Sequence, residues 1–297
     1  MFSMEDFIIF VFCRIDDHFT ELTGGQNIRR SGFSPALTDS ELITTETAGE
    51  FLKIDTDKGI WEYFRRHRLH FFPCLGSGTT SVRQSASLCY RKQKLRRKSA
   101  EKLNAFPDNI HIADGFPVPV CRFRRAFFSE NFRGEAAYGH CASEDEKYYG
   151  FRGHLPIGFS GVITECSPTP ANIGGRDVLP ELLPDIQGLI TGDKGYISTC
   201  LREELLSYGI DLQTPFRSNM KDERDPEFVR MLISVRRKTG TVTGQLGGRF
   251  AAGKIRARDK WHMTGGITRK LLPHTAGLFI NHLYGGELLQ PDGIIAS

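Results

Sequence analysis

The spacing of apolar residues separates the chain into two parts. Up to about residue 105, apolar side chains recur every three to four positions, as at Phe7, Val11 and Ile15. This spacing places them on one face of a helix, so it predicts a helix over residues 4–22. Further helices are predicted over residues 38–51, 60–72 and 79–103. We therefore expect the first part of the chain to be helical.

After residue 105 the pattern changes to short apolar runs separated by glycine and proline. Strands are predicted over residues 109–114, 188–193 and 210–214, and a hairpin over 154–157 and 162–166. Helices are predicted over residues 198–208 and from Asp225 onward, each after a capping residue. Strands that alternate with helices predict an α/β domain over residues 106–297.

The composition fits an ordinary globular protein. The chain has 297 residues, of which 39% are hydrophobic and 25% charged, and this balance excludes collagen-like, disordered and coiled-coil classes. Its seven cysteines form no C-x-x-C pair, so neither a zinc site nor a disulfide framework is indicated. The longest apolar run, residues 7–13, is too short to cross a bilayer. We expect a soluble cytoplasmic protein with no membrane partner.

Basic residues are concentrated in two blocks, although the net charge is only +4. Residues 91–98 contain six basic side chains in eight positions. Residues 228–270 contain eleven, against the single acid Asp259. Each block alone is more typical of a solvated face. Together they favour a polyanionic partner such as nucleic acid.

Two aspartates are candidates for chemistry. Asp114 and Asp193 each lie at the end of a predicted strand and next to a glycine-containing turn. Open α/β sheets place their chemistry at strand ends, and paired carboxylates suit Mg²⁺. Two metal ions about 4 Å apart can hold the attacking and leaving oxygens of a phosphodiester. Each motif alone is more typical of an ordinary turn.

Several long segments resemble the bacterial insertion-sequence transposases of the DDE type. They begin with Ile112-Ala-Asp-Gly-Phe-Pro-Val-Pro-Val-Cys121 and continue with residues 132–141, 148–155, 169–172, 192–197 and 254–258, while 55–64 matches in the amino-terminal part. The resemblance implies a helical DNA-binding region over 1–105 and an RNase H-like catalytic domain over 106–297, with a mixed central sheet flanked by helices. It also implies two Mg²⁺ ions, cleavage of double-stranded DNA at element ends, transfer of the freed 3′-hydroxyl to target DNA, and a dimer on paired ends.

One departure from the family pattern concerns the third acid. The resemblance makes Asp114 and Asp193 the first two metal ligands and expects a glutamate in a block reading Arg-Arg-x-Ile-Glu-Thr-Val. Here the block is Arg236-Arg-Lys-Thr-Gly-Thr-Val242, so Gly240 stands at the glutamate position. Neighbouring positions on the same helix face carry no carboxylate. We expect a loss of catalysis of roughly 10³-fold or more.

Basic residues near these motifs are candidates for phosphate contacts. They are Lys194, Arg236, Arg237, Lys254, Arg256 and Arg258. A solvated basic edge explains the last three equally well. Two other functions stay open: a non-catalytic remnant that binds element ends without cutting, and an RNase H-like nuclease with no joining step.

Overall fold

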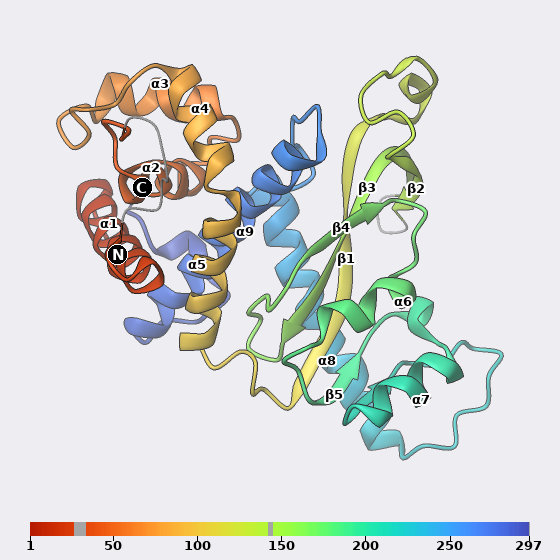
Figure 1. Cartoon of the computed structure of the whole chain (residues 1–297). Helices are drawn as coiled ribbons and strands as arrows, with labels where there is room; N and C mark the ends of the chain where they lie inside the picture. Colours follow the sequence, from red (N-terminus) through yellow and green to blue (C-terminus); the bar gives the residue numbers. More distant parts are fainter. Residues whose placement is uncertain (27–33, 142–144, 297) are drawn as a thin grey trace. The chain divides into compact units, whose positions relative to one another are not determined.

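The computed structural model describes residues 1–26, 34–141 and 145–296, which form two compact units (Figure 1). The helical unit comprises Met1–Ser99, Arg249–Ala252 and Asp259–Ser297, and the sheet unit comprises Ala100–Gly248 and Gly253–Arg258. The first boundary lies close to the expected one. The division differs at the other end, because residues 259–297 pack with the amino-terminal helices instead of completing the α/β domain.

The helical unit is built mainly from α-helices. Its elements are α1 (Met4–Thr23), α2 (Asp39–Phe51), α3 (Asp57–His67), α4 (Gly78–Ser87), most of α5 (Cys89–Lys102), α9 (Lys260–Leu283) and the 3-10 turn η5 (Pro291–Gly293). The predicted helix over 79–103 is two helices that meet at Leu88. The helix predicted over 60–72 ends early, at His67.

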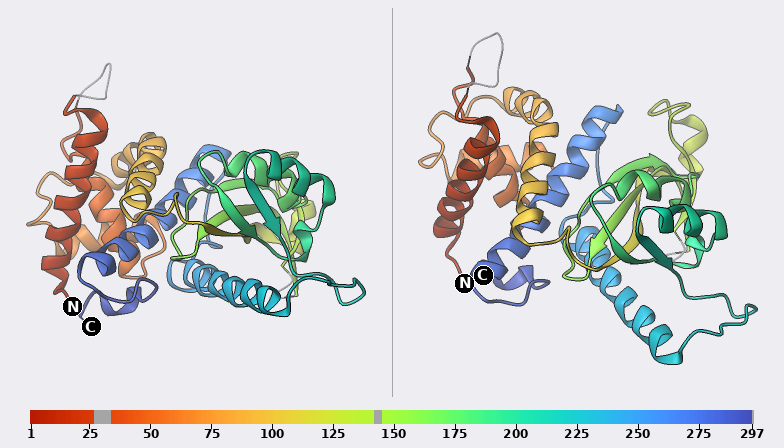
Figure 2. Two further views of the ribbon diagram at one scale, coloured as in Figure 1. Left: turned by 90° about the horizontal axis from the view of Figure 1, so that it is seen from below. Right: turned by 60° about the horizontal axis from the view of Figure 1, so that its bottom comes forward.

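Helix α2 forms the centre of this unit. A capping box begins it, in which Thr38 accepts from the Glu41 N–H and the Glu41 carboxylate accepts from the Thr38 N–H. Every residue of α2 except Glu41 is buried. Gly49 allows α3 to approach closely, because a Cβ there would lie 2.6 Å from Ile60. At the edge of the unit, Phe2 pairs with Ile295, so the two chain ends lie side by side (Figure 2).

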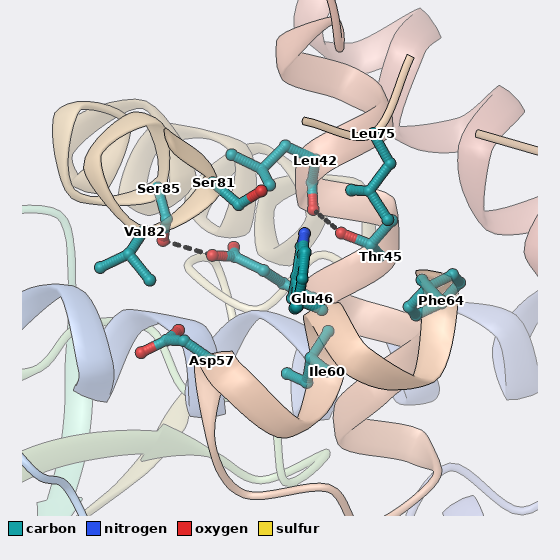
Figure 3. A pocket seen from close by; sticks show the side chains of 11 residues that line it. Leu42, Thr45, Glu46, Asp57, Ile60, Phe64, Leu75, Ser81, Val82 and Ser85 are labelled. Carbon is teal, nitrogen blue, oxygen red and sulfur yellow. Dashed lines mark hydrogen bonds between the residues drawn. The ribbon is translucent and has the colours of Figure 1, made fainter. Parts of the chain in front are cut away.

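A small pocket lies between α2, α3 and α4 (Figure 3). Apolar side chains such as Leu42 and Ile60 line it together with the carboxylates of Glu46 and Asp57. Ser85 donates a hydrogen bond to Glu46 at its rim. The pocket therefore opens onto a buried acid of the helical unit.

The sheet unit is a mixed sheet covered by helices, which confirms the predicted α/β class. Its strands are β1 (Ile110–Arg122), β2 (Ala137–Cys141), β3 (Glu146–Gly158), β4 (Ser167–Pro170), β5 (Gly188–Thr191) and β6 (Ile210–Gln213). The order is β2-β3-β1-β5-β6, with β4 also pairing with β3. Strands β1 to β4 pair antiparallel, whereas β5 pairs in parallel with both β1 and β6.

The helices and turns of this unit lie on both faces of the sheet (Figure 2). They are α6 (Gly175–Val178), α7 (Thr199–Ser207), α8 (Pro226–Gly244), the 3-10 turns η1 (Phe123–Phe128), η2 (Leu179–Leu182) and η3 (Lys194–Tyr196), and the π-helical turn η4 (Gln245–Arg249). As predicted, α8 begins after Asp225, which caps it, with Pro226 in its first turn. Its buried side chains Leu232, Val235 and Val242 recur at helical spacing.

One prediction about strands holds in part and another was wrong. Residues 154–157 and 162–166 lie antiparallel, joined by the bridge between Ile157 and Ile163 and by the hydrogen bond from the Thr164 N–H to the Pro156 carbonyl, but 162–166 does not form a full strand. The first strand does not end at Asp114 but continues to Arg122. Asp114 therefore lies inside a strand of the sheet.

No helix of the described part of the chain is both long enough and apolar enough to span a lipid bilayer.

Candidate active site

The sheet brings Asp114 and Asp193 to equivalent positions on neighbouring strands. Strands β1 and β5 run parallel, and the last pair in their register is Ile112 with Thr191. Each aspartate lies two residues beyond its member of that pair. Because neighbouring strands are about 4.8 Å apart, two side chains at equal height are close neighbours. Separation along the sequence does not indicate that the two aspartates are close, because they are 79 positions apart (193 − 114).

Local backbone groups fix both carboxylates. Oδ1 of Asp114 accepts a hydrogen bond from the Gly115 N–H at 2.8 Å. Oδ1 of Asp193 accepts from the Gly195 N–H at 2.8 Å and so caps the turn η3. No described residue donates to Oδ2 of Asp193. This oxygen remains available to a cation.

Helix α8 reaches the same site through Thr239. Thr239 is buried on the face of α8 that packs on the sheet, and its hydroxyl donates to the Arg236 carbonyl at 2.7 Å. The same hydroxyl lies close enough to the Asp114 carboxylate to lower the pKa of Asp114. Gly240 follows directly and is exposed, and a Cβ built on it meets no atom within 4 Å. The glutamate position of the family motif therefore directly follows Thr239 on α8 and has open space around it.

Burial and like charge act together on Asp114. Burial raises the pKa of Asp114, and the neighbouring Asp193 charge raises it further. The hydrogen bonds from Gly115 and Thr239 and the positive charge of Arg152 oppose this rise in the pKa. A metal ion at the site would add further positive charge and would also lower the pKa of Asp114.

Within the described residues, no group of three or more histidine, cysteine or acidic side chains is arranged to hold a metal ion. Asp114 and Asp193 supply two carboxylates, which suit a hard divalent cation. The position that would supply a third is Gly240. The arrangement can therefore provide carboxylate oxygens for one cation more readily than for two.

Comparison with known proteins identifies the fold and its family. A family described as "Transposase DDE domain" matches residues 104–259, which is more than half of the chain. The chain belongs to this DDE transposase family. Enzymes of the family cleave DNA and transfer strands, and their domains use divalent metal ions.

One solved structure is similar over most of the chain. It is described as a piggyBac transposase synaptic complex with hairpin DNA, with a TM-score of 0.44 and 11% identity, covering 98% of this chain and 78% of that one. The likeness is too distant to transfer any residue or contact. No curated protein sequence matches this chain.

The structure places most of the candidate DNA-contacting residues of this transposase at the surface. Lys194, Arg237, Lys254, Arg256 and Arg258 are exposed, and Arg236 is half-buried on α8. In the segment 254–258 the basic residues alternate with the half-buried Ile255 and Ala257. This alternation directs three cationic side chains to solvent from an extended segment.

Some basic side chains of the two blocks are buried rather than exposed to solvent. Lys92 and Arg96 of the first block are buried, and Lys92 pairs with Glu46 at 2.9 Å. In the second block, Lys270 is buried and pairs with Glu50 at 2.7 Å. Part of the positive charge therefore neutralises acids of the helical unit, which corrects the interpretation of both blocks as polyanion-binding surfaces.

Sequence reasoning missed two residues of the transposase site. Thr239 follows the buried spacing of α8, which is a signal that the sequence contains. Arg152 on β3 extends across Gly115, and a Cβ at that glycine would lie 2.9 Å from its Nε. Arg152 forms no ion pair or hydrogen bond with the described residues, although its charge acts on Asp114 and Tyr196. Arg152 lies within the family-like segment 148–155, but that segment alone does not single it out as a site residue.

Proposed function

We propose that this protein is an insertion-sequence DNA transposase in which Asp114 and Asp193 bind Mg²⁺ and Gly240 marks a lost third ligand. The observation that carries the proposal is the register of β1 and β5, which places Asp114 and Asp193 each two residues beyond the last pair, Ile112 with Thr191. The contact from Thr239 to Asp114 adds support, because it brings α8 close to Asp114 and position 240 directly follows Thr239.

The residues present fit a divalent cation. Two carboxylates anchored by backbone N–H groups form a preorganised pair of oxygen ligands. When bound, the cation polarises a phosphodiester and lowers the pKa of an attacking hydroxyl or water. Thr239 holds Asp114 in position, and Arg152 offers an unpaired guanidinium to a phosphate oxygen.

The substrate in this proposal is double-stranded DNA at the ends of a mobile element. Lys194, Arg237 and the exposed residues of 254–258 would contact its backbone, with Arg236 beside them on α8. The helical region that begins the chain would add further contacts. A homodimer would hold the two ends together, within the bacterial nucleoid.

Gly240 supports a second candidate function. A chain with two of three ligands positions the scissile phosphate poorly, which costs roughly 10³-fold or more in rate. Such a chain can still bind DNA through its basic residues. The alternative is therefore a transposase remnant that binds element ends without cutting them.

Restoring the glutamate separates these functions. A plasmid carrying the gene with its flanking DNA is incubated with Mg²⁺ and either the wild-type protein or Gly240→Glu. We expect Gly240→Glu to cut at the element ends at least about 10³-fold faster, because its side chain enters open space and completes the ligand set.

Two matched variants control this experiment. Gly240→Gln has the same size without the charge and should stay as slow as the wild type, and Asp193→Ala provides the blank. If Gly240→Glu binds the ends but does not cut, the remnant is the correct function. If the wild type already cuts as fast as Gly240→Glu, position 240 is not a metal-ligand position.

A further inference from the structure

The turn that follows β1 exposes two adjacent aromatic rings. Phe127 and Phe128 are 84% and 81% exposed, more than any other aromatic side chain in the described part of the chain. Their ring centroids lie 5.3 Å apart at 87°. Two phenylalanine rings exposed side by side leave a large apolar surface in contact with water, which is unfavourable, so the pair is a candidate contact surface.

Arginines surround the two rings. Arg122, Arg124 and Arg125 are exposed, and none of them forms an ion pair or hydrogen bond with the described residues. The next acid along the chain is Glu130, which pairs with Arg133 at 3.0 Å. We call residues 122–128 the Phe-Arg turn. Its charge is purely positive.

The Phe-Arg turn is anchored to the sheet. Ala126 is buried, and the ring of Phe123 packs 5.2 Å from that of Tyr138 on β2. Tyr138 in turn packs 5.4 Å from the buried Tyr149 of β3. The turn is therefore held in place at the end of β1 (Figure 1).

Apolar rings set among unpaired arginines match the chemistry of distorted duplex DNA. Minor-groove proteins insert apolar side chains between base steps and place cations on the flanking phosphates. A protein partner would have to offer both an apolar surface for the two rings and acidic groups for the arginines. DNA offers both, because regularly spaced phosphates flank its stacked bases. Charge complementarity therefore favours DNA.

We propose that the Phe-Arg turn is a wedge that enters duplex DNA, with Phe127 and Phe128 between base pairs and the arginines on phosphates. This rests on the proposed function, in which DNA is the substrate. Arg122 lies eight positions after Asp114 along β1, so the Phe-Arg turn begins about 26 Å from Asp114 at 3.3 Å per residue.

Binding to two DNA probes tests the wedge. The full-length protein is titrated against a fluorescent duplex and against the same duplex with a central mismatched step. A wedge binds the mismatched duplex more tightly, because the unstacking cost is already met there. We expect about a tenfold preference for the wild type, and none for Phe127→Ala/Phe128→Ala.

Two further variants sharpen the result. Tyr208→Ala removes another aromatic ring of the sheet unit that is 71% exposed, and it should keep the tenfold preference. Arg124→Gln/Arg125→Gln should weaken binding to both duplexes equally. It should also reduce the slope of log K against log salt by about 1.8, since each phosphate contact contributes about 0.9.

The outcomes separate the wedge from the proposed function. If the wild type binds DNA and the double phenylalanine variant keeps the mismatch preference, the wedge is overturned and the proposed function stands. If the wild type sediments as a dimer that the double variant dissociates, the rings hold a second copy of the chain and the wedge is overturned. If the wild type binds neither duplex, both proposals fall. Unchanged circular dichroism and melting temperature establish that the variants are folded.

Discussion

The molecule holds two pairs of neighbouring carboxylates, one in each unit. Glu46 and Glu50 lie one turn apart on α2, whereas Asp114 lies on β1 and Asp193 lies two residues beyond the end of β5. Both pairs are removed from bulk water to a large degree. They differ in what neutralises them.

Lysines and an arginine from distant helices neutralise the pair on α2. Lys92 donates to both carboxylate oxygens of Glu46, at 3.2 and 2.9 Å. Lys270 and Arg269 approach Glu50 to 2.7 and 3.0 Å. Burial nevertheless raises the pKa of Glu50 to about 7 against the attraction of these two cations.

The pair in the sheet unit has no such partner. Among the described residues, no lysine, arginine or histidine lies within ion-pair distance of Asp114 or Asp193. The positive charge of Arg152 lowers the pKa of Asp114 without forming an ion pair with it. Carboxylates that the protein pairs internally support the fold, whereas neighbouring carboxylates that it leaves unpaired are suited to a cation from outside.

Removing Lys92 should have the largest effect on stability. Lys92→Met leaves Glu46 buried with only the hydroxyl of Ser85 as a partner, which costs about 3–5 kcal/mol of unfolding free energy. Urea denaturation measures the loss. The double variant Lys92→Met/Glu46→Gln removes the uncompensated charge and should recover most of it. A loss below about 1 kcal/mol in Lys92→Met would mean that this pair is not structural.

Magnesium should stabilise the wild type through the other pair. At ten times the dissociation constant, a ligand that binds only the folded state adds about 1.4 kcal/mol. Melting curves with and without MgCl₂ measure this shift. It should disappear in Asp193→Asn and persist in Glu203→Gln, which alters an exposed acid of α7. An equal shift in Asp193→Asn would place the bound ion elsewhere.

The smallest expected effect is a pH dependence from Asp114. Its folded pKa is raised, so between the ordinary value of 3.8 and the raised value the folded state holds more protons than the unfolded state. Stability therefore falls as pH rises through this window and stays constant above it. Asp114→Asn removes this contribution, so the variant should gain stability over the wild type with rising pH. Urea midpoints across the acidic range test the sign, and an opposite slope would contradict the raised pKa.

Local patterns in the sequence were sufficient to predict several elements. The four-residue spacing from Phe7 to Ile15 gave the first helix, and Asp225 before Pro226 marked the start of α8. The candidate aspartates were also visible as strand-associated motifs. These features depend on residues that are near one another in the chain.

The length of β1 was not predictable from such patterns. The glycine-containing turn motif after Asp114 suggested that the strand ended there. Pro117 and Pro119 also fit poorly in a strand paired on both edges, because proline cannot donate to a ladder. In the structure β5 pairs with β1 only as far as Ile112, so beyond it one edge of β1 has no described strand partner and tolerates proline. The neighbouring strands determine how far β1 extends, and local sequence patterns do not reveal which strands become neighbours.

The buried cations were unpredictable for a similar reason. Lys92 and Lys270 look like surface residues within basic blocks, but their acidic partners lie 46 and 220 positions away. The same holds for Arg152, whose proximity to Asp114 follows from the antiparallel pairing of β1 with β3. Tertiary contacts override the expectation that charge runs are solvated.

The helical unit is discontinuous in sequence, and this dictates the order in which the molecule can mature. The sheet unit is inserted between α5 and α9, so a ribosome releases all of it before the last helix of its neighbour exists. Until α9 emerges, Glu50 lacks Arg269 and Lys270 and the bridge from Phe2 to Ile295 cannot form. Translation that stops early therefore leaves a finished catalytic scaffold attached to an unfinished bundle.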